Sequence, residues 1–448
     1  MSQSVSTIGV GYVGVSTSVG FAAKGCKVLA YDKDLAKTNL LIEGLSPFYE
    51  RELEEHLQRV RRDGFFEIAS NVEEAVKNTD ITFVTVGTPS RADGTINLDY
   101  IKASTTDIGK ALVKKEGYHL VVVKSTVIPG TTVNMVKPLL EKTSNRQCGE
   151  DFGLCMNPEF LREGSGLYDT IHPDRIVIGE YDRKSGDTLE SLYNHFHREE
   201  KPPIVRTNLS TAELIKYANN AFLATKISYI NSIANICEKI PETDIKTVAK
   251  AIGLDKRINP KFLRAGLGYG GSCFPKDLKA LIAFSKQNNY HPSLLKAVQK
   301  VNQQQIDHVI DRIETQLGEL TNKKICLLGL SFKPDTDDMR EARSIPIINQ
   351  LLAKGARIAV YDPIAISNAK VIFGNEVEYA SSVPECLENS ECCILVTEWS
   401  EFKELEPEDF IKKMKTPLLV DGRRIFDPEI FGQKLKYVAI GLGPPKIG

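Results

Sequence analysis

Long apolar runs, paired cysteines and an excess of charge of one sign are all missing from this sequence of 448 residues. No apolar stretch approaches the roughly 18 residues that cross a bilayer, and the N-terminus "MSQSVSTIGVGYVG" has neither region of a signal peptide. The 57 Lys and Arg residues nearly balance the 58 Asp and Glu residues, which argues against a general nucleic-acid or membrane-surface role. We therefore expect a globular protein of two or three domains.

The nine cysteines are scattered, without C-x-x-C pairs or clustered histidines. This spacing argues against a disulfide framework and against a zinc site, so we expect no metal. Reduced thiols are typical of the cytoplasm, where we expect the protein to work.

Short apolar strands alternate with helix-length segments in both halves of the chain. The first half contains "VSTIGV", "CKVLAYD", "ITFVTVG", "HLVVVKST" and "DFGLCMNP", and the second contains "KKICLLGLSF", "ARIAVYDP", "CCILVTEW" and "TPLLVDGR". Such alternation predicts parallel sheets covered by helices on both faces. Between them, residues 210–239 lack Gly and Pro and carry apolar residues at helical spacing, with Ser210 and Glu213 as an expected capping box. We predict an α/β protein in which two Rossmann-like, doubly wound domains, residues 1–200 and 316–448, are joined by a long central helix and a helical region, residues 201–315.

A glycine motif follows the first predicted strand. Gly9, Gly11 and Gly14 form G-x-G-x-x-G between "VSTI" and a helical stretch, and Asp32 ends the second strand eighteen positions after Gly14. The glycines let backbone amides approach a pyrophosphate at a helix N-terminus, and Asp32 can accept hydrogen bonds from ribose hydroxyls. A plain tight turn would explain the glycines alone, but the strand, helix and acidic residue around them favour an NAD site. The carboxylate repels a 2′-phosphate, which favours NAD over NADP.

The stretch "GYGGSCFPKD" places Cys273 on a glycine-rich turn. Elsewhere, "MNPEFLREG" sets Glu159 and Glu163 four residues apart, on one side of an expected helical turn, and Lys216 and Asn220 have the same spacing in the long helix. "KSTVIPGTT" follows a strand end, and "SFKPDTDDMREARS" supplies Lys333 and Arg340. Taken singly, each pair also fits a solvated helix face, and a lone cysteine is more often an inert small residue than a nucleophile.

Taken together, these stretches resemble the nucleotide-sugar 6-dehydrogenases of the UDP-glucose/GDP-mannose dehydrogenase family. The resemblance rests on motifs that run in the family's order from Gly9 to Arg424: "GVGYVG", "VGTPSRADG", "KSTVIPGTT", "NPEFLREGSGLYDTIHPDRIVIG", "ELIKYANNAFLATKIS", "GLGYGGSCFPKD", "GLSFKPDTDDMRE", "YDP", "TEW" and "DGRR". Two positions depart from the usual pattern. Ser331 stands where alanine is usual, and Asn259 stands where glycine usually follows the Arg-Ile pair.

The resemblance implies an NAD-dependent oxidoreductase that carries out a four-electron oxidation of UDP-glucose to UDP-glucuronate with two NAD+. Cys273 is expected to add to the intermediate aldehyde, giving a thiohemiacetal and then a thioester that water hydrolyses. The thiolate is the nucleophile, so nearby positive charge from Lys216 or Lys276 is expected to favour it. The family also implies a homodimer, with residues 201–315 as the helical dimerisation domain, in which Arg257 reaches the site of the other subunit.

The resemblance carries roles onto individual positions of this sequence. Lys216 and Asn220 are expected to stabilise an oxyanion, Asp277 to work with Lys216 on a water, Glu159 to act as general base for hydrolysis, and Thr126 to bind the same water. The division of proton transfers among Glu159, Lys216 and Asp277 is left open. The implied NAD contacts are Gly9, Gly11, Tyr12, Val13, Gly14, Asp32, Lys37, Thr88, Pro89, Thr126, Glu163, Lys276 and Arg340. The implied nucleotide-sugar contacts are Glu159, Phe160, Leu161, Arg162, Glu163, Lys216, Asn220, Arg257, Phe262, Leu263, Arg264, Gly266, Gly270, Lys333 and Arg423. The turn "GLSFKPD" lacks a dinucleotide fingerprint, so the C-terminal domain is expected to hold the uridine nucleotide.

Three alternatives stay open at this point. The first is the same chemistry on UDP-N-acetylmannosamine, UDP-N-acetylglucosamine or GDP-mannose, although relatives acting on UDP-N-acetyl sugars typically have "NPER" where this chain has "NPEFLREG", and "HPDRIVIG" favours UDP-glucose. The second is a two-electron 6-phosphogluconate or hydroxyacid dehydrogenase, which needs no thiol. The third is an NAD-binding regulatory module without catalysis.

Overall fold

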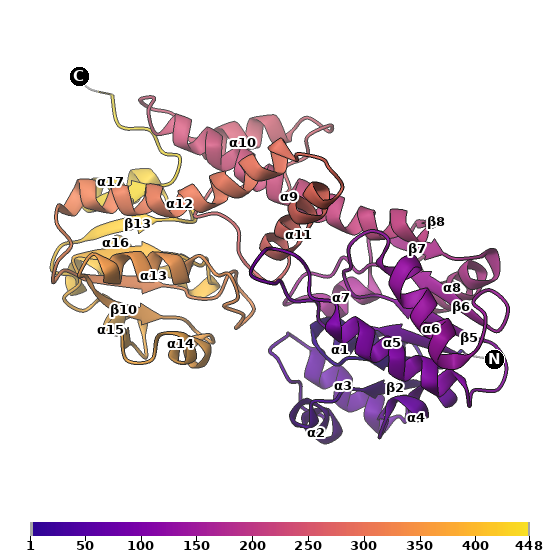
Figure 1. The fold of residues 1–448 in the computed structure, drawn as a ribbon. Helices are drawn as coiled ribbons and strands as arrows, with labels where there is room; N and C mark the ends of the chain where they lie inside the picture. The colour runs from indigo at the N-terminus through magenta and orange to yellow at the C-terminus, as the bar shows by residue number, and fades with distance from the viewer. Residues whose placement is uncertain (1–2, 447–448) are drawn as a thin grey trace. The chain divides into compact units, whose positions relative to one another are not determined.

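A computed structural model describes residues 3–446, and the chain divides into two compact units, residues 1–219 and 220–448 (Figure 1). Each unit is built on one β-sheet with helices on both faces. The predicted α/β architecture with two doubly wound sheets and a long central helix is therefore confirmed. The predicted three-part division at residues 200 and 315 stays a prediction.

The sheet of the first unit has eight strands in the order β3-β2-β1-β4-β5-β6-β7-β8. Neighbouring strands are parallel except for β6 and β7, which are antiparallel. The order reverses at β1, so the ends of β1 and β4 form the switch point at which doubly wound sheets bind ligands. The strands are β1 Val5–Ile8, β2 Val28–Tyr31, β3 Phe66–Ile68, β4 Ile81–Val84, β5 His119–Val123, β6 Phe152–Met156, β7 Ile176–Glu180 and β8 Ile204–Asn208.

Two apolar clusters cover the two faces of this sheet. One joins the sheet to α1, α2, α3, α7 and α8, and the other joins it to α4, α5, α6 and the first turn of α9. The strands are buried on both faces, which explains why they read as continuous apolar runs. The helices are α1 Tyr12–Ala23, α2 Leu35–Glu43, α3 Leu53–Arg62, α4 Val72–Lys77, α5 Asp99–Leu112, the π-helix η1 Thr132–Val136, α6 Lys137–Ser144, α7 Gly166–Ile171, α8 Arg183–Phe196 and α9 Leu209–Cys237.

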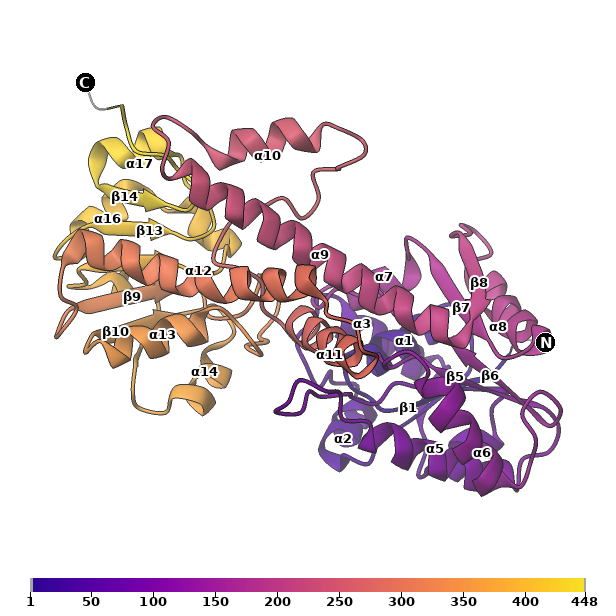
Figure 2. The same cartoon turned by 45° about the horizontal axis from the view of Figure 1, so that its top comes forward.

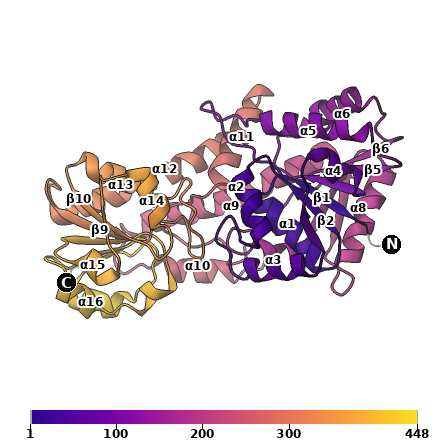
Figure 3. The same ribbon diagram turned by 90° about the horizontal axis from the view of Figure 1, so that it is seen from below.

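The second unit repeats the doubly wound order with six parallel strands, β11-β10-β9-β12-β13-β14. Helices α13 and α14 cover one face and α15 and α16 cover the other, as Figure 3 shows, and α17 packs into the same apolar cluster as α15 and α16. The strands are β9 Lys324–Leu328, β10 Arg357–Tyr361, β11 Glu378–Tyr379, β12 Cys392–Leu395, β13 Leu418–Asp421 and β14 Lys436–Ala439. The helices are α10 Ile245–Gly253, α11 Phe274–Gln287, α12 Ser293–Leu317, α13 Ser344–Ala353, α14 Ile366–Phe373, α15 Val383–Leu387, the 3-10 helix η2 Ser400–Glu404, α16 Pro407–Lys413 and α17 Pro428–Lys434.

The long helix α9 spans 29 residues, and its later turns pack along α12 (Figure 2). The expected capping box at its start is wrong. The Asn208 side chain caps this end by accepting from the Thr211 amide at 2.9 Å. The Glu213 carboxylate instead binds the loop after β5, because three backbone and hydroxyl donors lie there.

Within residues 3–446, none of the helices combines the length and apolar character needed to span a membrane. None of the nine cysteines forms a disulfide within residues 3–446, and eight of them are buried. Cys273 is the partly exposed one, so its thiol is the most accessible of the nine.

Candidate functional site

The glycine motif lies where β1 meets α1, with Gly11 at the N-terminus of the helix. Gly14 packs so tightly that an added Cβ would lie 1.8 Å from the Gly9 carbonyl oxygen, and a Cβ on Gly9 would lie 2.9 Å from the Thr85 backbone. Gly11 differs, because apart from its chain neighbours and the backbone of its own helix no protein atom lies within 4 Å of an added Cβ. Gly87, after β4, is equally open. The backbone is therefore open at Gly11 and Gly87, which follow the two strands of the switch point, and we call this opening the glycine cradle. It fits a dinucleotide pyrophosphate that approaches the backbone.

Asp32 lies just after β2, where one carboxylate oxygen accepts from the Val10 amide at 2.7 Å and the other from the Asp34 amide at 3.0 Å. Asp362 occupies the same place after β10, but six donors surround it, including the Trp399 indole at 3.0 Å. Asp362 is 1% exposed, whereas Asp32 is half-buried. Only the first unit therefore offers an acidic side chain to a ribose at this position.

The loops after β4 and β5 carry the next predicted residues. Thr88 donates from its hydroxyl to the Thr126 carbonyl at 2.8 Å, which joins the two loops, and Pro89 follows Thr88. Tyr12, at the start of α1, donates to the Arg162 carbonyl at 2.8 Å and accepts from the Gly166 amide at 2.7 Å. The glycine loop is thus fixed to the segment that holds Glu163. Val13 lies beside Tyr12 in the same first turn.

Glu159 and Lys216 form a buried ion pair, with Lys216 Nζ 2.8 Å from Glu159 Oε1. Both side chains are nearly inaccessible, at 6% and 4% exposure. Burial opposes ionisation of Glu159, yet the Lys216 ammonium and the Leu161 amide hold its pKa below the usual value. Glu159 is therefore ionised, as a base requires.

The expected helical turn through Glu159 and Glu163 is wrong, because residues 157–162 have no regular secondary structure. Glu159 turns inward to Lys216, and the Arg162 guanidinium donates three hydrogen bonds to the Asp169 carboxylate. Two cations lie over the Phe160 ring, the Arg175 guanidinium at 3.8 Å and the Lys216 ammonium at 5.5 Å from its centroid. The residue types in the stretch "PEF" contain no pattern that predicts an irregular segment or these ring contacts.

The contacts of two buried residues of the first unit, Glu213 and Lys124, were not predicted from the sequence, although Glu213 was expected in a capping box. Glu213 accepts from the Gly130 amide at 2.5 Å, the Thr132 amide at 2.7 Å and the Thr132 hydroxyl at 2.6 Å. Lys124 donates to the Asn157 side chain at 2.9 Å. The sequence offered one indication of their importance, which was closeness to predicted site residues. Glu213 lies three residues before Lys216, and Lys124 lies two residues before Thr126.

The second unit carries the thiol and its predicted partners. Cys273 is the residue before α11, with its sulfur 3.6 Å from the Ser272 hydroxyl oxygen. One turn into the helix, Asp277 is 1% exposed; it accepts from Asn220 Nδ2 at 2.6 Å and pairs with Lys276. A thiolate at a helix N-terminus is stabilised by the helix dipole. The structure thus brings Asn220, Lys276 and Asp277 together, and Lys216 and Asn220 lie one turn apart on α9 as predicted.

The glycines before Cys273 are needed by the fold itself. An added Cβ would lie 2.2 Å from the Glu341 carbonyl oxygen at Gly270 and 2.8 Å from the Gly422 carbonyl oxygen at Gly266. Asn231, Asn302, Gln305 and Arg343 hydrogen-bond the backbone of residues 266–269. This buried scaffold fixes the loop that is expected to meet the diphosphate.

The other predicted contacts lie on loops or helix surfaces. Exposed cations pair with near neighbours: Lys37 with Asp34, Arg257 with Asp255 and Arg340 with Asp338. The Lys333 ammonium lies 5.7 Å from the Phe332 ring, and Arg423 bonds the Val396 carbonyl and lies 3.4 Å from Glu398. Phe262 has φ +67° and its ring lies 6.1 Å from that of Phe274, Leu263 is buried and Arg264 is exposed.

The two departures from the family pattern have local structural roles. Asn259 has φ +65°, the left-handed conformation that glycine and asparagine adopt most readily. Ser331 is 1% exposed and its hydroxyl donates to the Lys333 carbonyl at 2.9 Å. Both residues therefore fit the positions that they occupy.

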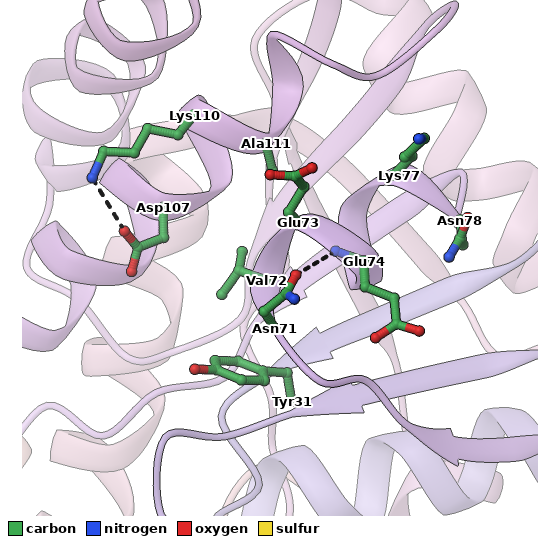
Figure 4. A pocket seen from close by; sticks show the side chains of 10 residues that line it. All are labelled: Tyr31, Asn71, Val72, Glu73, Glu74, Lys77, Asn78, Asp107, Lys110 and Ala111. Carbon is green, nitrogen blue, oxygen red and sulfur yellow. Dashed lines mark hydrogen bonds and ion pairs between the residues drawn. The ribbon is translucent and has the colours of Figure 1, made fainter.

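A separate cleft of about 590 Å³ lies between α4 and α5 (Figure 4). It is lined by Tyr31, Asn71, Val72, Glu73, Glu74, Lys77, Asn78, Asp107, Lys110 and Ala111. Asn71 caps α4 through the Glu74 amide, and Lys110 pairs with Asp107 at 3.7 Å. None of the predicted site residues lines this cleft, although Tyr31 directly precedes Asp32.

Comparison with known proteins accounts for nearly the whole chain. Residues 3–197 match the NAD binding domain, residues 210–304 the central domain and residues 326–428 the UDP binding domain of the UDP-glucose/GDP-mannose dehydrogenase family. The chain belongs to this family. Its NAD binding domain contains the open glycine cradle and Asp32, so the residues present fit the cofactor.

Individual members of the family resemble the chain over its whole length. The UDP-glucose 6-dehydrogenase YwqF of Bacillus subtilis is 42% identical over 440 residues, 98% of each chain. The UDP-glucose 6-dehydrogenase AglM of Haloferax volcanii is 41% identical and covers 94% of this chain and 96% of its own. A solved UDP-glucose dehydrogenase from Pyrobaculum islandicum superposes with a TM-score of 0.91 at 38% identity, covering 99% of this chain and 98% of that one. Family membership therefore rests on both sequence and fold.

Proposed function

We propose that this family member oxidises UDP-glucose to UDP-glucuronate with two NAD+ and one water. The observation that carries the proposal is the grouping around Cys273, in which a partly exposed thiol starts α11 and the buried Asn220–Asp277–Lys276 set lies one turn on. A two-electron dehydrogenase needs no such thiol. The names of relatives at about 40% identity support the choice of sugar.

The chain's own residues supply the chemistry around two hydride transfers. NAD+, when bound, accepts one hydride in each oxidation. After the alcohol has become an aldehyde, the Cys273 thiolate adds to the carbonyl carbon, and the resulting hemithioacetal loses its hydride to become a thioester. Water then cleaves the C–S bond, releasing carboxylate and regenerating the thiol. The ionised Glu159 is the base proposed to take the proton of that water, and Lys216 and Asn220 are the donors proposed for the oxyanion.

The decisive experiment is NADH production against UDP-glucose, UDP-N-acetylmannosamine, UDP-N-acetylglucosamine and GDP-mannose. Two NADH per UDP-glucose consumed, with UDP-glucuronate as product, are expected. Cys273→Ser should abolish complete turnover, because the oxygen is a far weaker nucleophile than a thiolate. One NADH per sugar, or full turnover by Cys273→Ser, would rule out the thioester route; preference for another sugar would transfer the same chemistry to it.

We also propose that the active form is a homodimer with Arg257 acting across the interface. Phe222, Tyr229 and Ile236 recur every seven residues on α9 and are 64%, 53% and 54% exposed. Such a stripe on one helix favours helix-to-helix association. Arg257 follows α10 and its side chain is 89% exposed, so it can reach another molecule.

Co-expression tests this shared site directly. Arg257→Ala and Cys273→Ser subunits are each expected to be inactive alone, but a mixed dimer holds one site with both native residues. Recovered activity in the co-purified mixture supports the proposal, and none contradicts it. Phe222→Glu should convert the dimer to monomer in analytical ultracentrifugation. The nine cysteines, none of which is in a disulfide, support a reducing, cytoplasmic location, which cell fractionation checks.

A further inference from the structure

Lys124 is a buried cation with a neutral partner. It follows β5, is 7% exposed, and donates from Nζ to Asn157 Oδ1 at 2.9 Å. Asn157 is itself fixed, since its amide donates to the Val177 carbonyl at 2.8 Å and its oxygen also accepts from the Tyr193 hydroxyl at 2.5 Å. Lys124 is therefore fixed by a residue that lies two positions before Glu159 in the chain.

A buried ammonium normally pairs with a carboxylate or loses its proton, because desolvation of an unpaired charge is costly. The hydrogen bond of Lys124 goes to an amide instead, and the Phe83 ring 5.9 Å away adds only a weak interaction. An apolar side chain of the same length would fill this space without that cost. The presence of a buried amine at this position, in place of an apolar side chain, points to a role in the reaction at the Glu159–Lys216 pair.

The neighbouring charges are those of the proposed hydrolytic step. Glu159 lies two residues after Asn157, and both Glu159 and Lys216 act electrostatically on Lys124. Tyr193 is the other titratable group in this network, and burial raises its pKa, which keeps the phenol neutral and donating. Because Lys216 is neutralised by its ion pair with Glu159, the pair alone has no net charge to offer a developing oxyanion.

We propose that Lys124 is a positioning residue that gives the Glu159–Lys216 pair a net positive charge and thereby favours negative charge on the reacting substrate. This inference rests on the proposed function. Burial lowers the pKa of Lys124 to about 8, a change that Glu159 opposes and Lys216 reinforces. The positive charge is therefore present at neutral pH and is lost as the pH rises through about 8.

Kinetics of three variants test the role. In wild type, kcat is expected to decline above about pH 8, where Lys124 loses its proton. Lys124→Met should lower kcat by about tenfold, which is less than the loss on removing a direct oxyanion donor, and should leave KM for UDP-glucose within about twofold. The variant should also lack the decline in kcat above about pH 8. Lys124→Arg should keep most of the rate and extend the plateau to higher pH. Lys115→Met is the matched control, because Lys115 of the same unit also bonds only neutral carbonyls, those of Lys77 and Thr79. A Lys124→Met profile that matches wild type overturns the proposal.

A second measurement does not depend on turnover. The Lys124 resonance in protein labelled with 13C at lysine Cε, assigned with Lys124→Arg, should titrate near pH 8. Its midpoint should fall in Glu159→Gln, which removes a negative neighbour, and rise in Lys216→Met, which removes a positive one. An ordinary lysine midpoint near 10.5, or one that neither variant moves, overturns the electrostatic coupling. If wild type makes no NADH from UDP-glucose, the proposed function fails while this titration still tests the coupling.

Discussion

Substitution of Glu213 by glutamine should change how stability depends on pH. Glu213 is fully buried, and burial raises its pKa from 4.5 to about 7 against three hydrogen bonds that favour the carboxylate. Because the folded-state pKa lies above the unfolded-state value, the protonated form stabilises the fold at low pH. That contribution is complete below about pH 4.5 and is lost as the pH rises through about 7. At about 1.4 kcal/mol per pH unit, the interval corresponds to about 3 kcal/mol.

The neutral glutamine lacks this titration, so the difference in unfolding free energy between Glu213→Gln and wild type should shift by about 3 kcal/mol in favour of the variant between pH 4.5 and 8. Urea unfolding followed by far-ultraviolet circular dichroism at several pH values measures it. Glu116→Gln, at an exposed residue of the same unit, serves as control. Parallel pH curves for Glu213→Gln and wild type would refute the reasoning. The absolute stability of Glu213→Gln is a separate quantity. It is expected to fall, because the glutamine NH₂ group replaces an acceptor oxygen next to hydrogen-bond donors.

Three further substitutions have expected outcomes. Gly14→Ala should prevent folding of the first unit or abolish NAD binding, because the new Cβ would lie 1.8 Å from the Gly9 carbonyl oxygen; soluble expression and NAD titration check this. Asp277→Asn should lower kcat by about 10²-fold with little change in KM, because the buried Asn220 amide loses its carboxylate partner, and an unchanged kcat would contradict the role. Asn259→Val should lower the unfolding free energy by about 1–2 kcal/mol, because a β-branched residue is strained at φ +65°; Asn259→Gly, measured in the same denaturation series, should change it by less.

The doubly wound sheets could be predicted because their causes are local. Strands buried on both faces read as apolar runs, and the glycine motif with Asp32 depends on spacing along one strand–turn–helix unit. The i,i+4 relation of Lys216 and Asn220 follows from helix geometry alone. The same local logic failed for Glu159 and Glu163, where nothing in the spacing distinguishes a helical turn from the irregular segment that forms.

What the sequence by itself determined, therefore, is the order of elements, the cofactor cradle and, through its long motifs, the family. Tertiary structure alone decided which buried charges meet. Glu213 reaches the loop at Thr132, more than eighty positions earlier in the chain, and Lys124 reaches Asn157 on the neighbouring strand end. The Glu213 contact follows from the packing of the sheet against α9, and the Lys124 contact from the adjacency of β5 and β6. Inside the protein the dielectric is low, so a buried charge needs a hydrogen-bond partner, and the fold determines which group is close enough to provide it. No pattern of residue types along the chain carries that information.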